Sequence, residues 1–140
     1  MSGALAERVG RRARAAWDER PALRIGIDGH VIGKTIGGVE RYVEKVVELV
    51  PDLCPQHQFI VFVARRNMAR FAADSRRNVQ FVGLPVADPI VQRSLVLPWM
   101  VRKHRLDILH VQRIVPWACG GCRMLLTVHD LTTTGDGGCH

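Results

Sequence analysis

The segment QFIVFVA at residues 58–64 constrains the fold more than any other part of the sequence. The residues from Phe59 to Val63 are all apolar, so both faces of a strand formed here would need to be covered. Near-continuous apolar runs of this length are typical of parallel strands that lie between two layers of helices. The run is far shorter than the roughly 20 residues that cross a bilayer. The segment therefore predicts an interior strand of an α/β sheet.

Other segments share this strand-like length and apolar content, and helical patterns separate most of them. The alternation predicts an α/β fold, with parallel strands joined by right-handed helical crossovers. More specifically, we expect a doubly wound, mostly parallel sheet of about five strands. The expected strands are residues 23–28, 58–64, 78–84, 106–112 and 122–130.

The helical patterns differ in strength. Valines at helical spacing over 39–50, opposite a charged face, predict an amphipathic helix that ends before Pro51. A short helix is expected at 66–74. Another is expected at about 90–103, and Pro98 should kink or split it because proline has no backbone N–H.

The two ends of the chain differ in composition from its middle. Residues 1–22 form a basic lead-in that is rich in Ala and Arg, and we expect it to be either helical or disordered. The folded domain is expected at 23–131, and 132–140 should form an irregular tail. The N-terminus lacks the apolar core of a secretory signal, so a cytoplasmic location is expected.

The formal net charge of +7 favours anionic partners, such as phosphorylated molecules, nucleic acid or an acidic membrane surface. One Tyr and four Phe offer little for base stacking, so no specific nucleic acid is expected. Residues 89–105 mix apolar with basic side chains. That pattern fits a helix packed on the sheet, or peripheral contact with the inner membrane face. A basic module that binds nucleic acid or anionic membrane stays open as an alternative.

The cysteines offer a second alternative, a small zinc or thiol protein. Cys119 and Cys122 have zinc-knuckle spacing, and Cys139 with His140 would complete four ligands. Adjacent side chains rarely reach the same tetrahedral ion, so no metal site is expected.

Polar residues gather where the predicted strands end, at the edge where parallel sheets bind ligands. Two glycines, Gly37 and Gly38, precede the amphipathic helix. They would let a phosphate or sugar approach the helix N–H groups, although a tight turn explains them equally well. The histidines could bind a hydroxyl or phosphate, act as acid or base, or be structural. The residues at the strand ends are Asp28, His30, His110, Gln112, His129 and Asp130.

Three passages occur in an order and spacing that a known family shares. RIGIDGHVIGKTIGGVERYVEKVVELV resembles that family's first strand, glycine loop and first helix. LPWMVRKHRLDILHVQ resembles its helix followed by D-[IV]-[LV]-H, and MLLTVHDL resembles its apolar strand followed by HDL. Together they resemble the N-terminal domain of a GT-B fold, family-four retaining glycosyltransferase, a class also called glycosyl transferases group 1. The resemblance covers residues 23–131, and it implies that the α/β sheet is Rossmann-like and incomplete, because the family's first domain continues with more strands after HDL.

The resemblance implies transfer of a sugar from a nucleotide-sugar donor to a sugar or lipid acceptor, with no cofactor and no obligatory metal. It implies that His129, as the catalytic residue, contacts the transferred sugar. The family's donor domain would lie beyond residue 140, so the chain is expected to be truncated and unable to transfer sugar alone. The substrate-binding residues that it implies are Gly37, Gly38, His110, Gln112 and Asp130.

Overall fold

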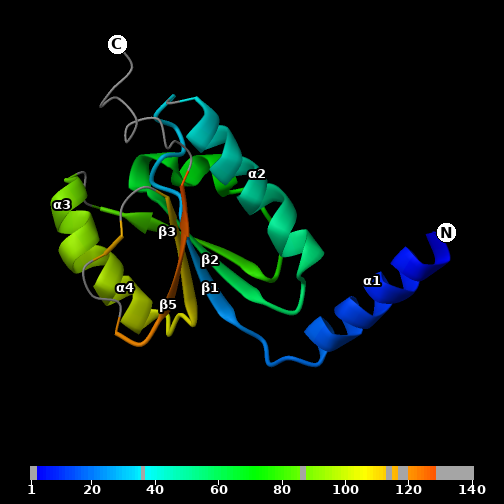
Figure 1. The fold of residues 1–140 in the computed structure, drawn as a ribbon. Coiled ribbons are helices and arrows are strands. Elements are labelled where there is room, and N and C mark those ends of the chain that lie inside the picture. Colours follow the sequence, from blue (N-terminus) through cyan, green and yellow to red (C-terminus); the bar gives the residue numbers. More distant parts are fainter. Residues whose placement is uncertain (1–2, 36, 86–87, 113–114, 117–119, 129–140) are drawn as a thin grey trace, which may run out of the picture.

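The computed structural model is built around a sheet of five parallel strands (Figure 1). It describes residues 3–35, 37–85, 88–112, 115–116 and 120–128. The strands are β1 (Arg24–Asp28), β2 (Gln58–Ala64), β3 (Val79–Leu84), β4 (Ile108–Gln112) and β5 (Arg123–Thr127). Their spatial order is β3-β2-β1-β4-β5, which follows the Rossmann order 3-2-1-4-5-6 over its first five strands, and the described residues form no sixth strand. The expected α/β, Rossmann-like and incomplete fold is therefore confirmed.

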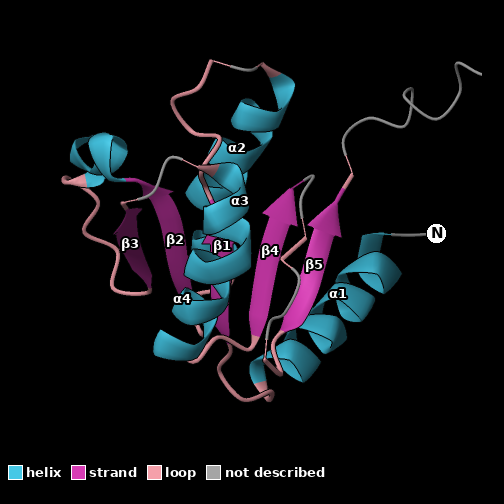
Figure 2. Cartoon of the chain, turned by 90° about the vertical axis from the view of Figure 1, so that its left-hand side faces the viewer, coloured by secondary structure: helices cyan, strands magenta, loops and turns pink. Residues whose placement is uncertain are grey.

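Helices cover both faces of the sheet. They are α1 (Gly3–Asp18), α2 (Gly38–Leu53), the 3-10 helix η1 (Arg65–Phe71), α3 (Pro89–Val91), the π-helix η2 (Gln92–Val96) and α4 (Leu97–Lys103). One face packs against α2, and the other packs against the stretch from α3 to α4 (Figures 1 and 2). The lead-in forms α1, which projects from the sheet with its described side chains exposed. Within the described residues, no helix is long and apolar enough to cross a membrane.

The β2 run divides the core into two clusters, one on each face of the sheet. Side chains alternate along a strand, so Phe59, Val61 and Val63 pack with the α2 cluster. Ile60 and Phe62 pack with the α4 cluster. All five of these side chains are almost fully buried. The continuous apolar run therefore marks an interior strand with helices on both faces, as its pattern predicts.

The expectation that the first amphipathic helix ends before Pro51 is wrong. Helix α2 continues to Leu53, and Pro51 is buried within its last turns. A proline there has no N–H to donate to the carbonyl of Val47, four residues earlier. In this protein that carbonyl accepts a hydrogen bond from Nη1 of Arg76 at 3.1 Å instead. A distant arginine thus supplies the donor that proline lacks, and the helix can continue.

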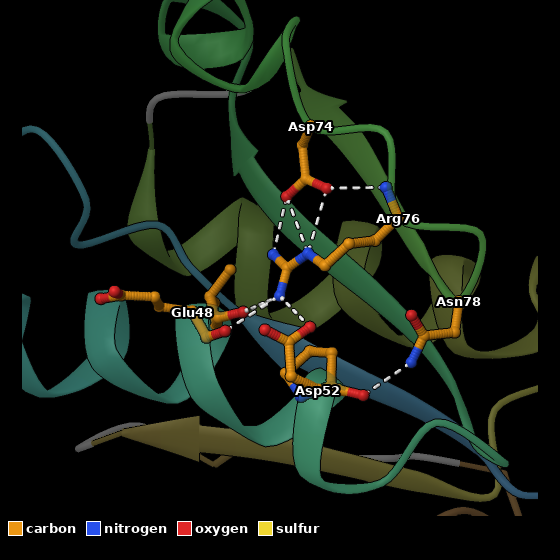
Figure 3. Close-up of polar contacts among 7 residues, drawn as sticks. Glu48, Asp52, Asp74, Arg76 and Asn78 are labelled. Carbon is orange, nitrogen blue, oxygen red and sulfur yellow. Dashed lines mark hydrogen bonds and ion pairs between the residues drawn. The ribbon is translucent and has the colours of Figure 1, made fainter.

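Arg76 is the centre of a polar network at the C-terminal end of α2 (Figure 3). Its Nη1 also donates to the carbonyl of Glu48 at 3.0 Å, while Nε and Nη2 donate to the Asp74 carboxylate. Through its hydrogen bonds, the guanidinium holds the pKa of Asp74 below its ordinary value. Asn78 donates to the carbonyl of Pro51 at 2.9 Å. The network joins the end of α2 to the loop before β3.

The helical stretch that contains Pro98 is interrupted, as expected, and the interruption is a π-helical turn just before the proline. The N–H of Leu97 bonds to the carbonyl of Gln92, five residues earlier, instead of four. Pro98 then stands in the first turn of α4, where a missing N–H costs little. The expected helix at 90–103 is present as three consecutive segments, and the expected helix at 66–74 is the 3-10 turn η1.

Strand β5 is the least covered strand of the sheet. Met124, Leu125 and Leu126 are all exposed, by 38%, 55% and 42% respectively. Its partner β4 is almost fully buried. Interior parallel strands are normally covered on both faces, so β5 has the composition of an interior strand and the exposure of an edge.

Candidate functional site

All five strands run in the same direction, so their carboxyl ends form one edge of the molecule (Figure 2). The loop after β1 crosses this edge and leads into the first turn of α2. Gly37 and Gly38 start that helix, and His110 and Gln112 lie in the last three residues of β4. The expected catalytic His129 and the expected ligand contact Asp130 lie outside the described residues.

The two glycines at the start of α2 have different roles. Gly37 has φ 85° and ψ −127°, a backbone conformation that side chains with a Cβ disfavour. Gly38 has no such requirement, and a Cβ at either position would meet nothing within 4 Å. No side chain caps the helix here. The turn therefore needs glycine at Gly37, whereas at Gly38 glycine leaves the helix terminus open to an incoming group.

A hydrogen-bonded chain joins β4, β5 and α2 at this edge. His110 Nε2 lies 2.7 Å from Oγ1 of Thr127, and that hydroxyl lies 3.2 Å from the Tyr42 hydroxyl. The rings of Tyr42 and His110 also meet edge to face, 6.1 Å apart. Tyr42 is one turn beyond Gly38, so the chain connects the histidine to the start of α2. His110 therefore has a fixed position, as a structural or a ligand-binding histidine would.

Gln112 lies two residues after His110, on the same face of β4 as the α2 cluster. Its side chain is fully buried, at 0% exposure. Within the described part of the chain, neither Oε1 nor Nε2 has a hydrogen-bond partner. Leaving a buried polar group unpaired costs about 1–3 kcal/mol. A primary amide held in this state is a donor and an acceptor available to a ligand with hydroxyl or phosphate oxygens.

Asp28 and His30 form a second pair at the same edge, at the end of β1. Asp28 is buried, and its carboxylate accepts bonds from the His30 backbone N–H at 3.2 Å and from Nδ1 at 2.9 Å. An ionised carboxylate only accepts, so Nδ1 carries the hydrogen and Nε2 is the free ring nitrogen. The sequence placed both residues at this edge but did not pair them.

The structure also brings in residues that the sequence analysis did not assign to the site. Tyr42 lies within the helix expected over 39–50, and Thr127 lies within the strand expected over 122–130. Their hydroxyls meet only because β5 lies beside β4 and α2 crosses that face. The position of Arg65 and Arg66, directly after β2, was a signal that could have been used. The rule that polar residues after parallel strands share one edge applies to them as well.

The described residues give no support for a metal centre. They contain no group of three or more His, Cys, Asp or Glu side chains able to hold an ion. Cys122 is half-buried, and its Sγ lies 3.3 Å from the carbonyl of Arg123. The other members of the zinc alternative, Cys119, Cys139 and His140, lie outside the described residues.

Comparisons with protein-family models, with curated proteins and with solved structures find no match to this chain. The fold and the geometry of the edge are therefore the basis for any functional proposal. At this edge the protein offers an open helix N-terminus, an unpartnered amide and a fixed imidazole, without a described metal cluster. This set can bind an oxygen-rich small molecule through hydrogen bonds.

Proposed function

We propose that this chain is the acceptor-side half of a nucleotide-sugar-dependent glycosyltransferase. The donor would be a nucleotide sugar, and the acceptor a sugar or a lipid-linked molecule. The observation that supports it best is the buried amide of Gln112, which has no described partner and belongs to the LDILHVQ passage. A sugar hydroxyl both donates and accepts a hydrogen bond, so it can satisfy such an amide.

Three further features support this proposal. The fold is the Rossmann-like sheet on which GT-B enzymes are built, although such a sheet serves many unrelated functions. The carboxyl edge combines the open start of α2 with the Tyr42–Thr127–His110 chain. Positive partial charge at the helix N-terminus favours the phosphates of a nucleotide sugar. In this reading, Gly38 leaves room for a phosphate and Gln112 contacts a sugar hydroxyl.

Glu40 is an apparent objection, because its carboxylate lies in the first turn of α2 and would repel a phosphate. Its Oε1 accepts a hydrogen bond from the Gly33 backbone N–H at 2.7 Å. This bond directs the carboxylate to the preceding loop. The Glu40 carboxylate is thereby engaged in a hydrogen bond within the protein.

Ligand binding to the full chain is the direct test, because in GT-B enzymes transfer also requires the second domain. The isotopically labelled protein is titrated with UDP-glucose, GDP-mannose and glucose while amide NMR signals are recorded. We expect at least one nucleotide sugar to shift the signals of Gly37, Gly38 and the Gln112 side chain. The Gln112→Met variant should weaken this binding about tenfold, which equals the loss of about 1.4 kcal/mol.

Two variants separate a ligand site from a merely structural turn. Gly38→Ala adds a methyl group where the protein has open space, so the fold should be retained while an approaching phosphate is obstructed. Gln80→Met, on an exposed position of β3, is the matched control and should bind normally. Unchanged affinity in both Gly38→Ala and Gln112→Met, or no binding of either nucleotide sugar, would overturn the proposal.

A further inference from the structure

A separate cavity opens at the same edge of the sheet, around the ends of β1, β2 and β3. Its volume is about 260 Å³, slightly below the range of about 300–1,000 Å³ for drug-sized ligands. The cavity therefore suits a small group better than a whole nucleotide. The polar residues of its lining are His30, Lys34, Arg65, Arg66 and Gln92.

The charge of this lining is entirely of one sign. Lys34, Arg65 and Arg66 contribute three cations, and no carboxylate is among the described residues of the lining. Within the described residues, none of the three forms an ion pair. Arg70, by contrast, is paired with Glu44. Three unpaired cations around one cavity raise the local concentration of anions.

The two basic segments of the lining are held in place by a direct contact. Asn67, within η1, donates from Nδ2 to the carbonyl of Ile32 at 2.7 Å. Gly33 makes this approach possible, because a Cβ there would lie 2.6 Å from the Asn67 amide, and its φ of 86° also favours glycine. The loop that carries Lys34 is thereby fixed against the turn that carries Arg65 and Arg66.

His30 gives the cavity a polar wall. Its Nδ1 is bound to Asp28, so the ring orientation is fixed and Nε2 has no partner within the described residues. The nearest carboxylate in sequence, that of Asp28, is buried behind the ring and accepts both of its hydrogen bonds from His30.

We propose that this cavity binds a phosphate group through Lys34, Arg65 and Arg66, and that the phosphate belongs to the acceptor. Guanidinium groups match phosphate oxygens in bidentate geometry, and a phosphate on a small alcohol fits the volume. Assigning the phosphate to the acceptor rests on the proposed glycosyltransferase function, whereas phosphate binding itself does not. The phosphate is supplied by a soluble ester or by a lipid headgroup.

The test titrates the labelled full chain with inorganic phosphate, glucose 1-phosphate and glucose. In parallel, its binding to phosphatidylcholine vesicles with and without phosphatidylinositol is measured. The phosphate compounds, but not glucose, should shift the amide signals of Lys34, Arg65 and Arg66. The double variant Arg65→Gln/Arg66→Gln should weaken this binding by about tenfold or more. Arg77→Gln/Arg123→Gln removes the same charge near the starts of β3 and β5, and should leave affinity within about twofold.

The outcomes distinguish the two sources and the two proposals. Binding of glucose 1-phosphate that depends on Arg65 and Arg66 identifies a soluble ester. The same dependence seen only with phosphatidylinositol vesicles identifies a lipid headgroup. No binding of any phosphate, or equal losses in the two double variants, overturns the proposal. The signals of Gly37, Gly38 and Gln112 report on the nucleotide-sugar site. A loss of nucleotide-sugar binding can therefore be distinguished from a loss of phosphate binding in the cavity.

Discussion

Arg76 and Gln112 lie at opposite edges of the sheet and differ in whether the protein satisfies their hydrogen-bonding groups. At the amino-terminal edge, Arg76 lies among Asp74 and the carbonyls of α2, with Nε, Nη1 and Nη2 all hydrogen-bonded (Figure 3). At the carboxyl edge, Gln112 is buried without a described partner, and Arg65 and Arg66 surround a cavity without a described ion pair. The hydrogen-bonding groups of Arg76 are therefore satisfied within the protein, whereas those of Gln112, Arg65 and Arg66 are available to a ligand.

Arg76 stabilises the fold through its hydrogen bonds, whereas the buried amide of Gln112 destabilises it. Arg76 compensates for the missing N–H of Pro51, so its loss would leave polar groups of the helix without partners. Gln112 contributes no described hydrogen bond to the fold, so its burial is a cost unless a ligand satisfies it. We therefore expect substitutions at the two edges to change stability with opposite signs.

The largest effect should come from Arg76→Ala. This variant removes the donors to Val47 and Glu48 and leaves the carboxylate of Asp74 unpaired. Hydrogen bonds of charged groups contribute about 1.5–3 kcal/mol each, so we expect a loss of about 2–4 kcal/mol in the free energy of unfolding. Urea denaturation measures it. Arg77→Ala, at the exposed neighbouring position, is the matched control and should change stability by less than about 0.5 kcal/mol. Similar losses in both variants would contradict the role assigned to Arg76.

The second effect should have the opposite sign. Gln112→Met replaces an unpartnered buried amide by an apolar side chain of similar length. We expect the free energy of unfolding to rise by about 1–2 kcal/mol while nucleotide-sugar binding weakens. Gln80→Met at the exposed position should leave stability nearly unchanged in the same urea experiment. A destabilised Gln112→Met protein would mean that the amide has a structural partner.

The smallest effect concerns pH and His104, which follows α4 and packs against Phe62. Burial, followed by the nearby charges of Lys103 and Arg24, lowers the pKa of His104 from 6.5. The unfolded chain therefore binds a proton more readily than the folded protein does. Stability should fall as pH drops below about 6.5 and continue to fall until the lowered pKa is passed. Unfolding of the wild type and of His104→Gln at pH 7.5 and pH 5 measures this, and the variant should lose less stability. An equal loss in both proteins would assign the pH dependence to other groups.

Local pattern and chain order were enough to predict most of the architecture. The apolar run from Phe59 to Val63 predicts a strand covered on both faces, and the structure confirms it. The parallel arrangement also places Gly38, His110 and Gln112 at one edge, because the ends of parallel strands coincide. The roles proposed for His129 and Asp130 stay predictions, since both residues lie outside the described part of the chain.

Only the tertiary structure decided which polar groups are paired. The sequence gives no sign that Arg76 would satisfy the carbonyl opposite Pro51, because 29 positions separate Arg76 from Val47 and the contact forms only when α2 packs on the sheet. Arg76 has hydrogen-bond partners and Gln112 has none within the described residues, and this difference also depends on how the elements pack. Periodicity reports which face of an element is apolar, and therefore fixes secondary structure and layers. Hydrogen-bond partners depend on distances between elements, which no local pattern contains.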